Sequence, residues 1–302
     1  MGARNRRWRS WALALAALLV VVAVAAVARD RSRSSSAAGT EERVVDVGGT
    51  EREFRLYRPA DLPESPALVL VLHGGGGSAR QAQETYGWDD LAAREGFAVA
   101  YPQGLHRTWN AGDCCGRAAR QGVDDVAFLT ALVRTVTDDL DVDPRRVYLA
   151  GMSNGAMMGY AFACATDTLA ALGAVAGSQV TDCPAPAPLS VVHVHGTADA
   201  SVLIDGGTGS GAGTVTAPPL AEVMASWRSV DACESPRTTR SGDVTTESAD
   251  CPEERTVESV VIDGAGHQWP GSAAPRAAAD PPSTALDATD YLWDFFAAHP
   301  RP

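Results

Sequence analysis

The stretch that most restricts how this chain can fold is the pentapeptide Gly-Met-Ser-Asn-Gly at residues 151–155. The run at 146–150 before it is apolar and β-branched, which is typical of a buried strand, and the run at 156–165 after it reads as a helix. A serine between glycines at such a junction predicts a sharp turn, the nucleophile elbow, with the Ser153 hydroxyl projecting from a sheet edge. We expect both glycines to be needed because strand and helix pass too closely for a Cβ. The alternative is a glycine-rich turn with an incidental serine.

Strand and helix patterns alternate along most of the chain. Expected strands lie at 44–47, 53–57, 67–72, 97–101, 146–150, 172–176, 190–195 and 257–262. Expected helices lie at 81–95, 123–140, 156–165, 219–230 and 286–298, whereas the polar stretch 237–255 is expected to be a loop. This alternation predicts an α/β fold with a mostly parallel central sheet and helices on both faces.

The N-terminus has the features of a targeting segment. Four arginines within residues 1–9 precede an uncharged run at 11–28 that ends in Ala-Val-Ala. This pattern favours a cleaved signal peptide at 1–28 and hence a secreted protein, or one on the extracellular face of the cell envelope. At about 1.5 Å per residue the run nearly spans a bilayer, so an uncleaved membrane anchor is the alternative. Residues 29–43 are expected to be a flexible linker and 44–302 a single catalytic domain.

Charge and cysteine content narrow the possible partners and cofactors. The formal net charge is −12, which argues against a nucleic-acid partner. Six cysteines in an exported chain indicate disulfides, and proximity suggests Cys164 with Cys183, Cys233 with Cys251, and a vicinal Cys114–Cys115 bridge. The sequence has no C-x-x-C spacing, so a zinc site is not indicated. No Gly-Lys-Ser/Thr follows the glycine run at 74–77, which excludes a phosphate-binding P-loop there. We expect no metal, no cofactor and a monomer.

Two further side chains complete a candidate catalytic set with Ser153. When an elbow of this kind carries catalysis, an acid and then a histidine follow it in the sequence. Asp199 follows the strand at 190–195, with Asp205 as the alternative, and His267 follows the strand at 257–262. Beyond Asp199 the chain has only one other histidine, His299, close to the carboxyl terminus. Because the carboxyl ends of parallel strands share one sheet edge, we expect Ser153, Asp199 and His267 to meet there.

A serine that attacks a carbonyl group also needs donors for the negative oxygen of the tetrahedral intermediate. The expected donors are the backbone N–H of Asn154 and that of Gly75, with Gly76 as the alternative. Trp109 and Trp269 flank the loops of this site and are candidates for an aromatic wall that binds substrate. A buried packing role is the alternative for both.

Together these motifs resemble the exported esterases grouped with polyhydroxybutyrate depolymerases and type-C feruloyl esterases. The similar segments cover nearly all of residues 44–300: 73–78 (HGGGGS), 101–104 (YPQG), 109–110 (WN), 114–116 (CCG), 122–126 (GVDDV), 151–156 (GMSNGA), 195–199 (HGTAD), 266–271 (GHQWPG) and 293–296 (WDFF). The resemblance implies an α/β-hydrolase fold, hydrolysis of carboxylic esters, and a triad of Ser153, Asp199 and His267.

The resemblance also bears on substrate. Secreted depolymerases of solid polyester usually append a linker and a substrate-binding domain, which this sequence does not show. Soluble hydroxyalkanoate oligoesters, or feruloyl or acetyl esters on plant polysaccharide, are therefore the expected substrates. The alternatives are an acyltransferase that uses the same triad on a cell-envelope acceptor, and a non-catalytic envelope binding protein.

Overall fold

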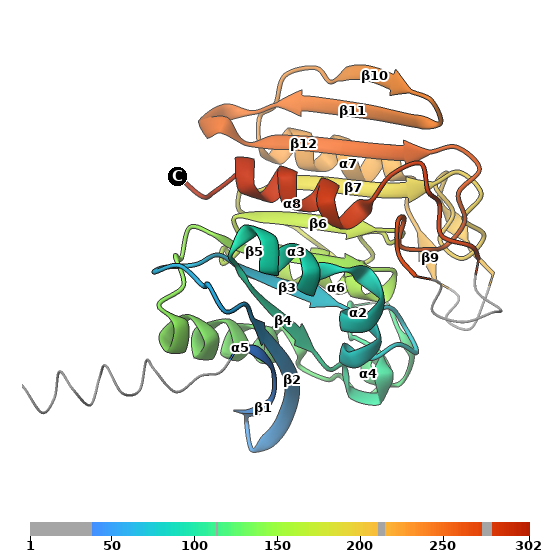
Figure 1. Ribbon diagram of the computed structural model, residues 1–302. Helices are drawn as coiled ribbons and strands as arrows, with labels where there is room; N and C mark the ends of the chain where they lie inside the picture. The colour runs from blue at the N-terminus through green and yellow to red at the C-terminus, as the bar shows by residue number, and fades with distance from the viewer. Residues whose placement is uncertain (1–37, 113, 211–214, 274–279) are drawn as a thin grey trace, which may run out of the picture. The chain divides into compact units, whose positions relative to one another are not determined.

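The computed structural model describes residues 38–112, 114–210, 215–273 and 280–302, and within them ten strands form one sheet (Figure 1). The predicted N-terminal segment 1–28 lies outside these residues. The sheet strands are β1 (Gly39–Val47), β2 (Thr50–Arg58), β3 (Leu68–Leu72), β4 (Ala98–Pro102), β5 (Val147–Met152), β6 (Ala171–Val175), β7 (Ser190–Gly196), β10 (Arg237–Ser241), β11 (Val244–Asp250) and β12 (Thr256–Ile262). A separate short pair is formed by β8 (Gly207–Thr208) and β9 (Thr216–Ala217).

The strand order is β1-β2-β4-β3-β5-β6-β7-β12-β11-β10. From β4 to β12 every neighbouring pair is parallel, and an antiparallel hairpin flanks this centre on each side. The mostly parallel sheet predicted from the alternating pattern is confirmed. Its parallel strands place β3, β5, β7 and β12 with their carboxyl ends at one edge, which is where such sheets carry their functional groups.

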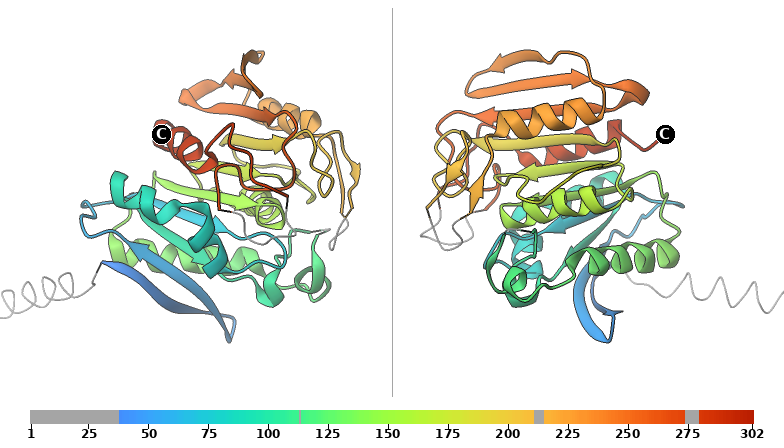
Figure 2. Two further views of the ribbon diagram at one scale, coloured as in Figure 1. Left: turned by 45° about the vertical axis from the view of Figure 1, so that its right-hand side comes forward. Right: turned by 180° about the vertical axis from the view of Figure 1, so that it is seen from behind.

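Helices cover both faces of the sheet. They are α2 (Ala79–Tyr86), α3 (Trp88–Glu95), α4 (Gly116–Arg120), α5 (Asp125–Leu140), α6 (Asn154–Ala165), α7 (Leu220–Val230) and α8 (Ala288–Ala298). Helices α2, α3 and α8 lie on the face turned to the viewer in Figure 1, and α5, α6 and α7 lie on the face seen from behind in Figure 2. No helix in the described ranges combines the length and apolar character that crossing a bilayer requires.

The sheet separates two hydrophobic cores. In β3 every residue is buried, and Leu68, Leu70 and Leu72 belong to the core with α5 and α6, whereas Val69 and Val71 belong to the core with α2, α3 and α8. Successive side chains of a strand point to opposite faces, so a strand covered on both sides must be apolar throughout. This explains the uninterrupted apolar runs in the sequence.

Three boundaries differ from the sequence-based expectations. The first strand begins at Gly39, inside the stretch 29–43 expected to be a linker, because it pairs with β2 along its whole length. The single helix expected at 81–95 is two helices, α2 and α3, separated at Gly87, which has a φ of 83°. The stretch 237–255 is not a loop: it holds the β10–β11 hairpin, in which β10 is exposed, β11 is mostly half-buried, and neither strand carries an apolar pattern.

Candidate active site

Ser153 occupies the sharp turn between β5 and α6. Its φ of 55° and ψ of −120° lie outside the regions that L-residues ordinarily adopt. A Cβ on Gly151 would lie 2.5 Å from the Gly155 carbonyl carbon, and one on Gly155 would lie 2.5 Å from the Leu72 carbonyl oxygen. The expectation that both positions require glycine is confirmed, because backbone occupies the space of either side chain.

The structure brings Ser153, Asp199 and His267 together at the carboxyl ends of β5, β7 and β12. The His267 Nε2 atom lies 2.9 Å from the Ser153 Oγ, and its Nδ1 lies 2.7 Å from the Asp199 Oδ2. The alternative acid, Asp205, is exposed and is not the partner of the imidazole. A hydroxyl, an imidazole and a carboxylate in this order can pass a proton from the serine to the histidine while the acid holds the ring.

Asp199 is buried but remains ionised. Its side chain is 0% exposed, and its Oδ1 accepts hydrogen bonds from the N–H groups of Ser201 (2.8 Å) and Val202 (2.9 Å). Burial on its own raises the pKa of this carboxyl, but the hydrogen bond and charge of His267 and the Val202 N–H outweigh it, so the pKa is lowered overall. A negative charge is thereby kept beside the imidazole at neutral pH.

The backbone of the His267 loop is held by an acid that the sequence analysis did not identify. The His267 N–H donates to the Asp280 Oδ2 at 2.8 Å, and a Cβ on Gly266 would lie 2.5 Å from the same oxygen. Asp280 stands in a stretch rich in alanine and proline without periodicity, so no sequence pattern assigns it a role.

Asn154 and Gly75, the two residues expected to supply oxyanion donors, lie close together. Asn154 is the first residue of α6, so its backbone N–H has no hydrogen-bond partner within the helix. Across from it, a Cβ built on Gly75 would lie 3.7 Å from the Asn154 Cβ. The N–H of Gly76 instead donates to the Arg107 carbonyl at 2.7 Å, so the alternative donor predicted at this position is already engaged.

The Asn154 side chain has a second role that was not predicted. Its Oδ1 accepts from the Trp109 N–H at 2.7 Å, and its Nδ2 donates to the Trp109 carbonyl at 3.1 Å. The N–H and the carbonyl of Trp109 are thus both bound by the Asn154 side chain. This clamp fixes the loop before α4 against the start of α6.

The prediction that Trp109 and Trp269 form a substrate-binding wall is wrong. The two side chains are 0% and 1% exposed, and each indole N–H has an internal partner. The Trp109 Nε1 donates to the His73 carbonyl at 2.9 Å, and the Trp269 Nε1 donates to the Thr289 Oγ1 at 3.0 Å. A large ring with a satisfied N–H packs well in an interior, so tryptophans near functional loops need not face the substrate.

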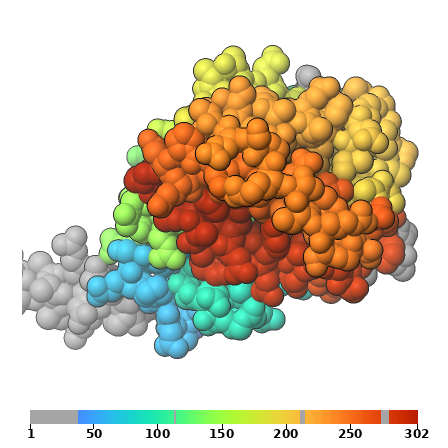
Figure 3. All heavy atoms as spheres, turned by 90° about the horizontal axis from the view of Figure 1, so that it is seen from above, coloured from blue at the N-terminus to red at the C-terminus, as the bar shows by residue number. Residues whose placement is uncertain are grey.

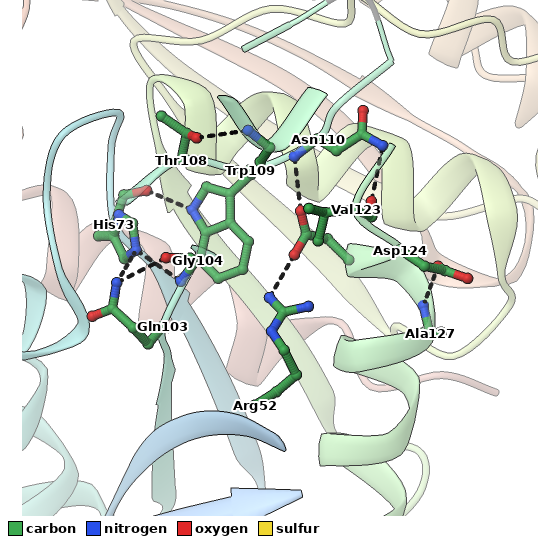
Figure 4. Close-up of polar contacts among 12 residues, drawn as sticks. Arg52, His73, Gln103, Gly104, Thr108, Trp109, Asn110, Val123, Asp124 and Ala127 are labelled. Atoms are coloured by element: carbon green, nitrogen blue, oxygen red, sulfur yellow. Dashed lines mark hydrogen bonds and ion pairs between the residues drawn. The ribbon is translucent and has the colours of Figure 1, made fainter. Parts of the chain in front are cut away.

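His73 joins two loops from a fully buried position (Figure 4). Its Nε2 accepts from the Gly104 N–H at 3.1 Å, so in the neutral ring the Nδ1 carries the hydrogen and donates to the Gly74 carbonyl at 2.8 Å. Burial is the main cause that lowers the pKa of His73 to about 4. The neutral imidazole therefore holds the glycine-rich loop after β3 in place.

A buried ion pair supports the loop on its other side (Figure 4). The Arg52 Nη2 lies 2.6 Å from the Asp125 Oδ1, with the two side chains 2% and 0% exposed, and the Asn110 N–H donates to the Asp125 Oδ2 at 2.8 Å. The guanidinium also lies over the Phe128 ring, 4.0 Å from its centre. Residues 109 and 110 are therefore held by Asn154 and Asp125 respectively.

The three predicted cysteine pairs are present as disulfides: Cys114–Cys115, Cys164–Cys183 and Cys233–Cys251. In the described ranges no group of three or more His, Cys, Asp or Glu side chains is arranged to hold a metal ion. A cavity of about 410 Å³ lies between the β1–β2 hairpin and the start of α2, and its lining does not include Ser153, Asp199 or His267.

Comparison with known proteins shows similarity to esterases. Residues 53–219 match the family described as esterase PHB depolymerase. The "Putative esterase NocK" of Nocardia uniformis subsp. tsuyamanensis is 32% identical over 79% of this chain and 76% of its own length. The bifunctional acetylxylan esterase/xylanase XynS20E of Neocallimastix patriciarum is 32% identical over 50% of this chain, but only 22% of that protein is covered.

A solved structure, the acetyl xylan esterase from Aspergillus awamori, superimposes with a TM-score of 0.61 and 16% identity, over 86% of this chain and 100% of that one. This likeness and the sheet topology confirm the α/β-hydrolase fold. The family match covers more than half of the chain, and the NocK relative is 32% identical over 79% of it. The chain therefore belongs to the esterase PHB depolymerase family of carboxylic ester hydrolases.

Proposed function

We propose that this chain is an exported serine esterase in which Ser153 is the nucleophile, His267 the general base and acid, and Asp199 the acid that orients the imidazole. The observation that carries the proposal is the continuous chain of hydrogen bonds from the Ser153 hydroxyl through His267 to Asp199, at 2.9 and 2.7 Å. Residues 1–28 serve as the export segment and the strands and helices from β1 onward as the catalytic domain.

In the acylation half of the reaction, the His267 Nε2 takes the proton of Ser153 as the Oγ attacks the carbonyl carbon of the ester. The carbonyl oxygen becomes an oxyanion, which accepts hydrogen bonds from the N–H groups of Asn154 and Gly75. The tetrahedral intermediate collapses as the imidazolium gives its proton to the alcohol oxygen. The alcohol leaves, and the acyl group stays on Ser153.

In the deacylation half, a water molecule occupies the place of the alcohol and gives a proton to the neutral His267. The resulting hydroxide attacks the acyl carbon, the same two N–H groups stabilise the oxyanion, and the Ser153 Oγ leaves with the proton returned by the imidazolium. The carboxylic acid is released. Throughout, the ionised Asp199 stabilises the positive charge that His267 carries transiently.

Covalent labelling tests the nucleophile directly. A fluorophosphonate probe should label the wild type and leave Ser153→Ala unlabelled, and kcat of that variant should fall by about 10³-fold or more. Ser241→Ala, on the exposed strand β10, is the matched control and should behave as the wild type. Equal labelling of Ser153→Ala, or no labelling of the wild type, would contradict the proposal.

For the substrate we propose soluble esters, either hydroxyalkanoate oligoesters or the acetyl and feruloyl esters of plant polysaccharide. Acetyl esters of xylan are named for the relative XynS20E, and the other two classes follow from the family resemblance. A panel of short 4-nitrophenyl esters, methyl ferulate, acetylated xylan and hydroxybutyrate oligomers, compared by kcat/KM, separates these classes. If none of the esters in the panel is hydrolysed, the proposed esterase activity is wrong.

A further inference from the structure

A chain of buried polar side chains runs from α6 across β7 to the turn that carries Asp199. The Tyr160 hydroxyl lies 2.8 Å from the His193 Nδ1, and the His193 Nε2 lies 3.0 Å from the His195 Nδ1. The His195 Nε2 in turn lies 2.8 Å from the Val202 carbonyl oxygen and 3.5 Å from the Asp199 Oδ2. Tyr160 and His193 are 0% exposed and His195 is 3% exposed.

The chemistry of the terminal acceptor fixes the direction of every hydrogen bond in this chain. A carbonyl oxygen only accepts, so the His195 Nε2 carries the hydrogen and the Nδ1 of the neutral ring is an acceptor. The hydrogen between the two rings must then sit on the His193 Nε2, which leaves the His193 Nδ1 to accept from the Tyr160 hydroxyl. Each link has one donor and one acceptor, and no group in the chain is left unpaired.

The burial of the two imidazoles agrees with this assignment. Burial is the largest cause that lowers the pKa of His193 and of His195, and in His193 the neighbouring ring lowers it further. Both rings are therefore neutral near pH 7. Alternate residues of a strand share one face, so β7 places His193 and His195 side by side on the α6 side of the sheet, with the apolar Val191 before them.

The far end of the chain bears on the carboxylate itself. Val202 is bound on two sides: its N–H donates to the Asp199 Oδ1 at 2.9 Å, and its carbonyl accepts from the His195 Nε2 at 2.8 Å. The turn from 199 to 202 cannot rotate without breaking one of these bonds. The other oxygen of Asp199, Oδ2, is the one that binds His267.

We propose that His195, held in its Nε2–H tautomer by His193 and Tyr160, is a positioning residue that aims the Asp199 carboxylate at His267. The inference rests on the proposed function, because it assigns His195 a part in that same reaction. An apolar residue would fill the same buried space, but it would leave the Val202 carbonyl unpaired and the turn free to rotate.

The test compares two replacements of similar size. His195→Leu fills the space without an N–H, whereas His195→Gln keeps an amide donor that can reach the Val202 carbonyl. For His195→Leu we expect kcat on a soluble ester to fall by about 10- to 100-fold with KM little changed, because a misaimed carboxylate affects the transition state more than substrate binding. His195→Gln should recover most of kcat.

A pH profile separates positioning from a general loss of structure. The groups facing His267 are Ser153, Asp199, His195 and, at its backbone, Asp280. If Asp199 is misaimed, the imidazolium loses stabilisation, and the acid limb of the kcat/KM profile should move to lower pH in His195→Leu but not in His195→Gln. His299→Leu, which removes a partly buried histidine bonded to Phe295 and Thr256, is the matched control and should leave the limb in place.

Imidazole ¹⁵N NMR reads the tautomers without reference to activity. Both His193 and His195, assigned through their glutamine variants, should give the Nε2–H pattern at pH 7 in the wild type. An Nδ1–H pattern for His195, or a His195→Leu variant with wild-type kcat and acid limb, overturns the inference while the proposed function stands. Absence of esterase activity in the wild type would instead remove the proposed function, and the positioning role with it.

Discussion

The buried titratable side chains next to the catalytic turns differ in charge: Asp199 is ionised, whereas three histidines are neutral. Asp199 stays ionised because its hydrogen bonds and the nearby imidazole offset the effect of burial. His73, His193 and His195 stay neutral because burial is not offset to the same degree. Protonating His73 or His193 would place an uncompensated charge in the interior. Acidification should therefore act against the folded state as well as against catalysis.

His73 allows this effect to be measured. In the unfolded chain its imidazole binds a proton near pH 6.5, but in the folded protein only near pH 4. The stability that the neutral ring contributes is thus fully present above about pH 6.5 and is lost as the pH falls toward 4. At about 1.4 kcal/mol per pH unit, the loss approaches roughly 3 kcal/mol. Urea unfolding at a series of pH values should show the difference between wild type and His73→Gln shrinking by this amount between pH 7 and pH 4. A difference independent of pH would refute the assignment.

At the scale of elements, the site depends on loops that are fixed from outside the catalytic groups. The loop before α4 is bound by Asn154 from the start of α6 and by Asp125 from the start of α5. The loop after β3 is bound by His73, and the turn after β7 by His195. Helix and strand ends thus supply the rigidity that the loops lack, and the donor proposed at Gly75 lies on one of these fixed loops.

The ion pair between Arg52 and Asp125 is a buried support, with the two side chains 2% and 0% exposed. Arg52→Met should lower the free energy of unfolding by about 3–5 kcal/mol, because the Asp125 carboxylate would remain in the interior without its counter-charge. The double variant Arg52→Met, Asp125→Leu should recover much of that loss. Arg145→Ala, which breaks an exposed pair with Asp143, should change stability far less. Urea unfolding of the four proteins checks this, and similar losses in Arg52→Met and Arg145→Ala would refute it.

Sequence reasoning succeeded where a local pattern reports directly on structure. Buried parallel strands leave apolar runs, and the elbow leaves two glycines at fixed spacing, so the central sheet and the grouping of Ser153, Asp199 and His267 could be predicted. The β10–β11 hairpin could not, because β10 is exposed and β11 is mostly half-buried, so neither strand needs apolar alternation. The burial of Trp109 and Trp269 depends on packing partners distant in sequence, and so does the contact of Asp280 with His267.

At the scale of the whole molecule, Gly39–Pro302 is one compact unit in which a single sheet divides two cores. Antiparallel hairpins close both sides of the sheet, and the outermost strand β10 is exposed along its whole length, with two arginines. Charged side chains on an edge strand disfavour pairing with another chain. Seen from above, the hairpin region (orange) lies next to the C-terminal segment (red) on the molecular surface (Figure 3).

The disulfides distribute stability over this architecture unequally. Cys164–Cys183 and Cys233–Cys251 join residues 19 and 18 apart, whereas Cys114–Cys115 joins neighbours and encloses no loop. Because a cross-link restricts the unfolded chain by an amount that grows with the logarithm of the loop length, removing either of the first two bridges as a double alanine variant should lower the free energy of unfolding by about 3 kcal/mol. Removing Cys114–Cys115 should have a much smaller effect on stability by this mechanism. It should act mainly on kcat, since Cys114 lies beside the Asn154 amide that clamps the loop at Trp109.

Urea unfolding and ester hydrolysis of the three double variants measure both quantities. Equal losses of stability in all three would show that loop closure is not what these bridges contribute.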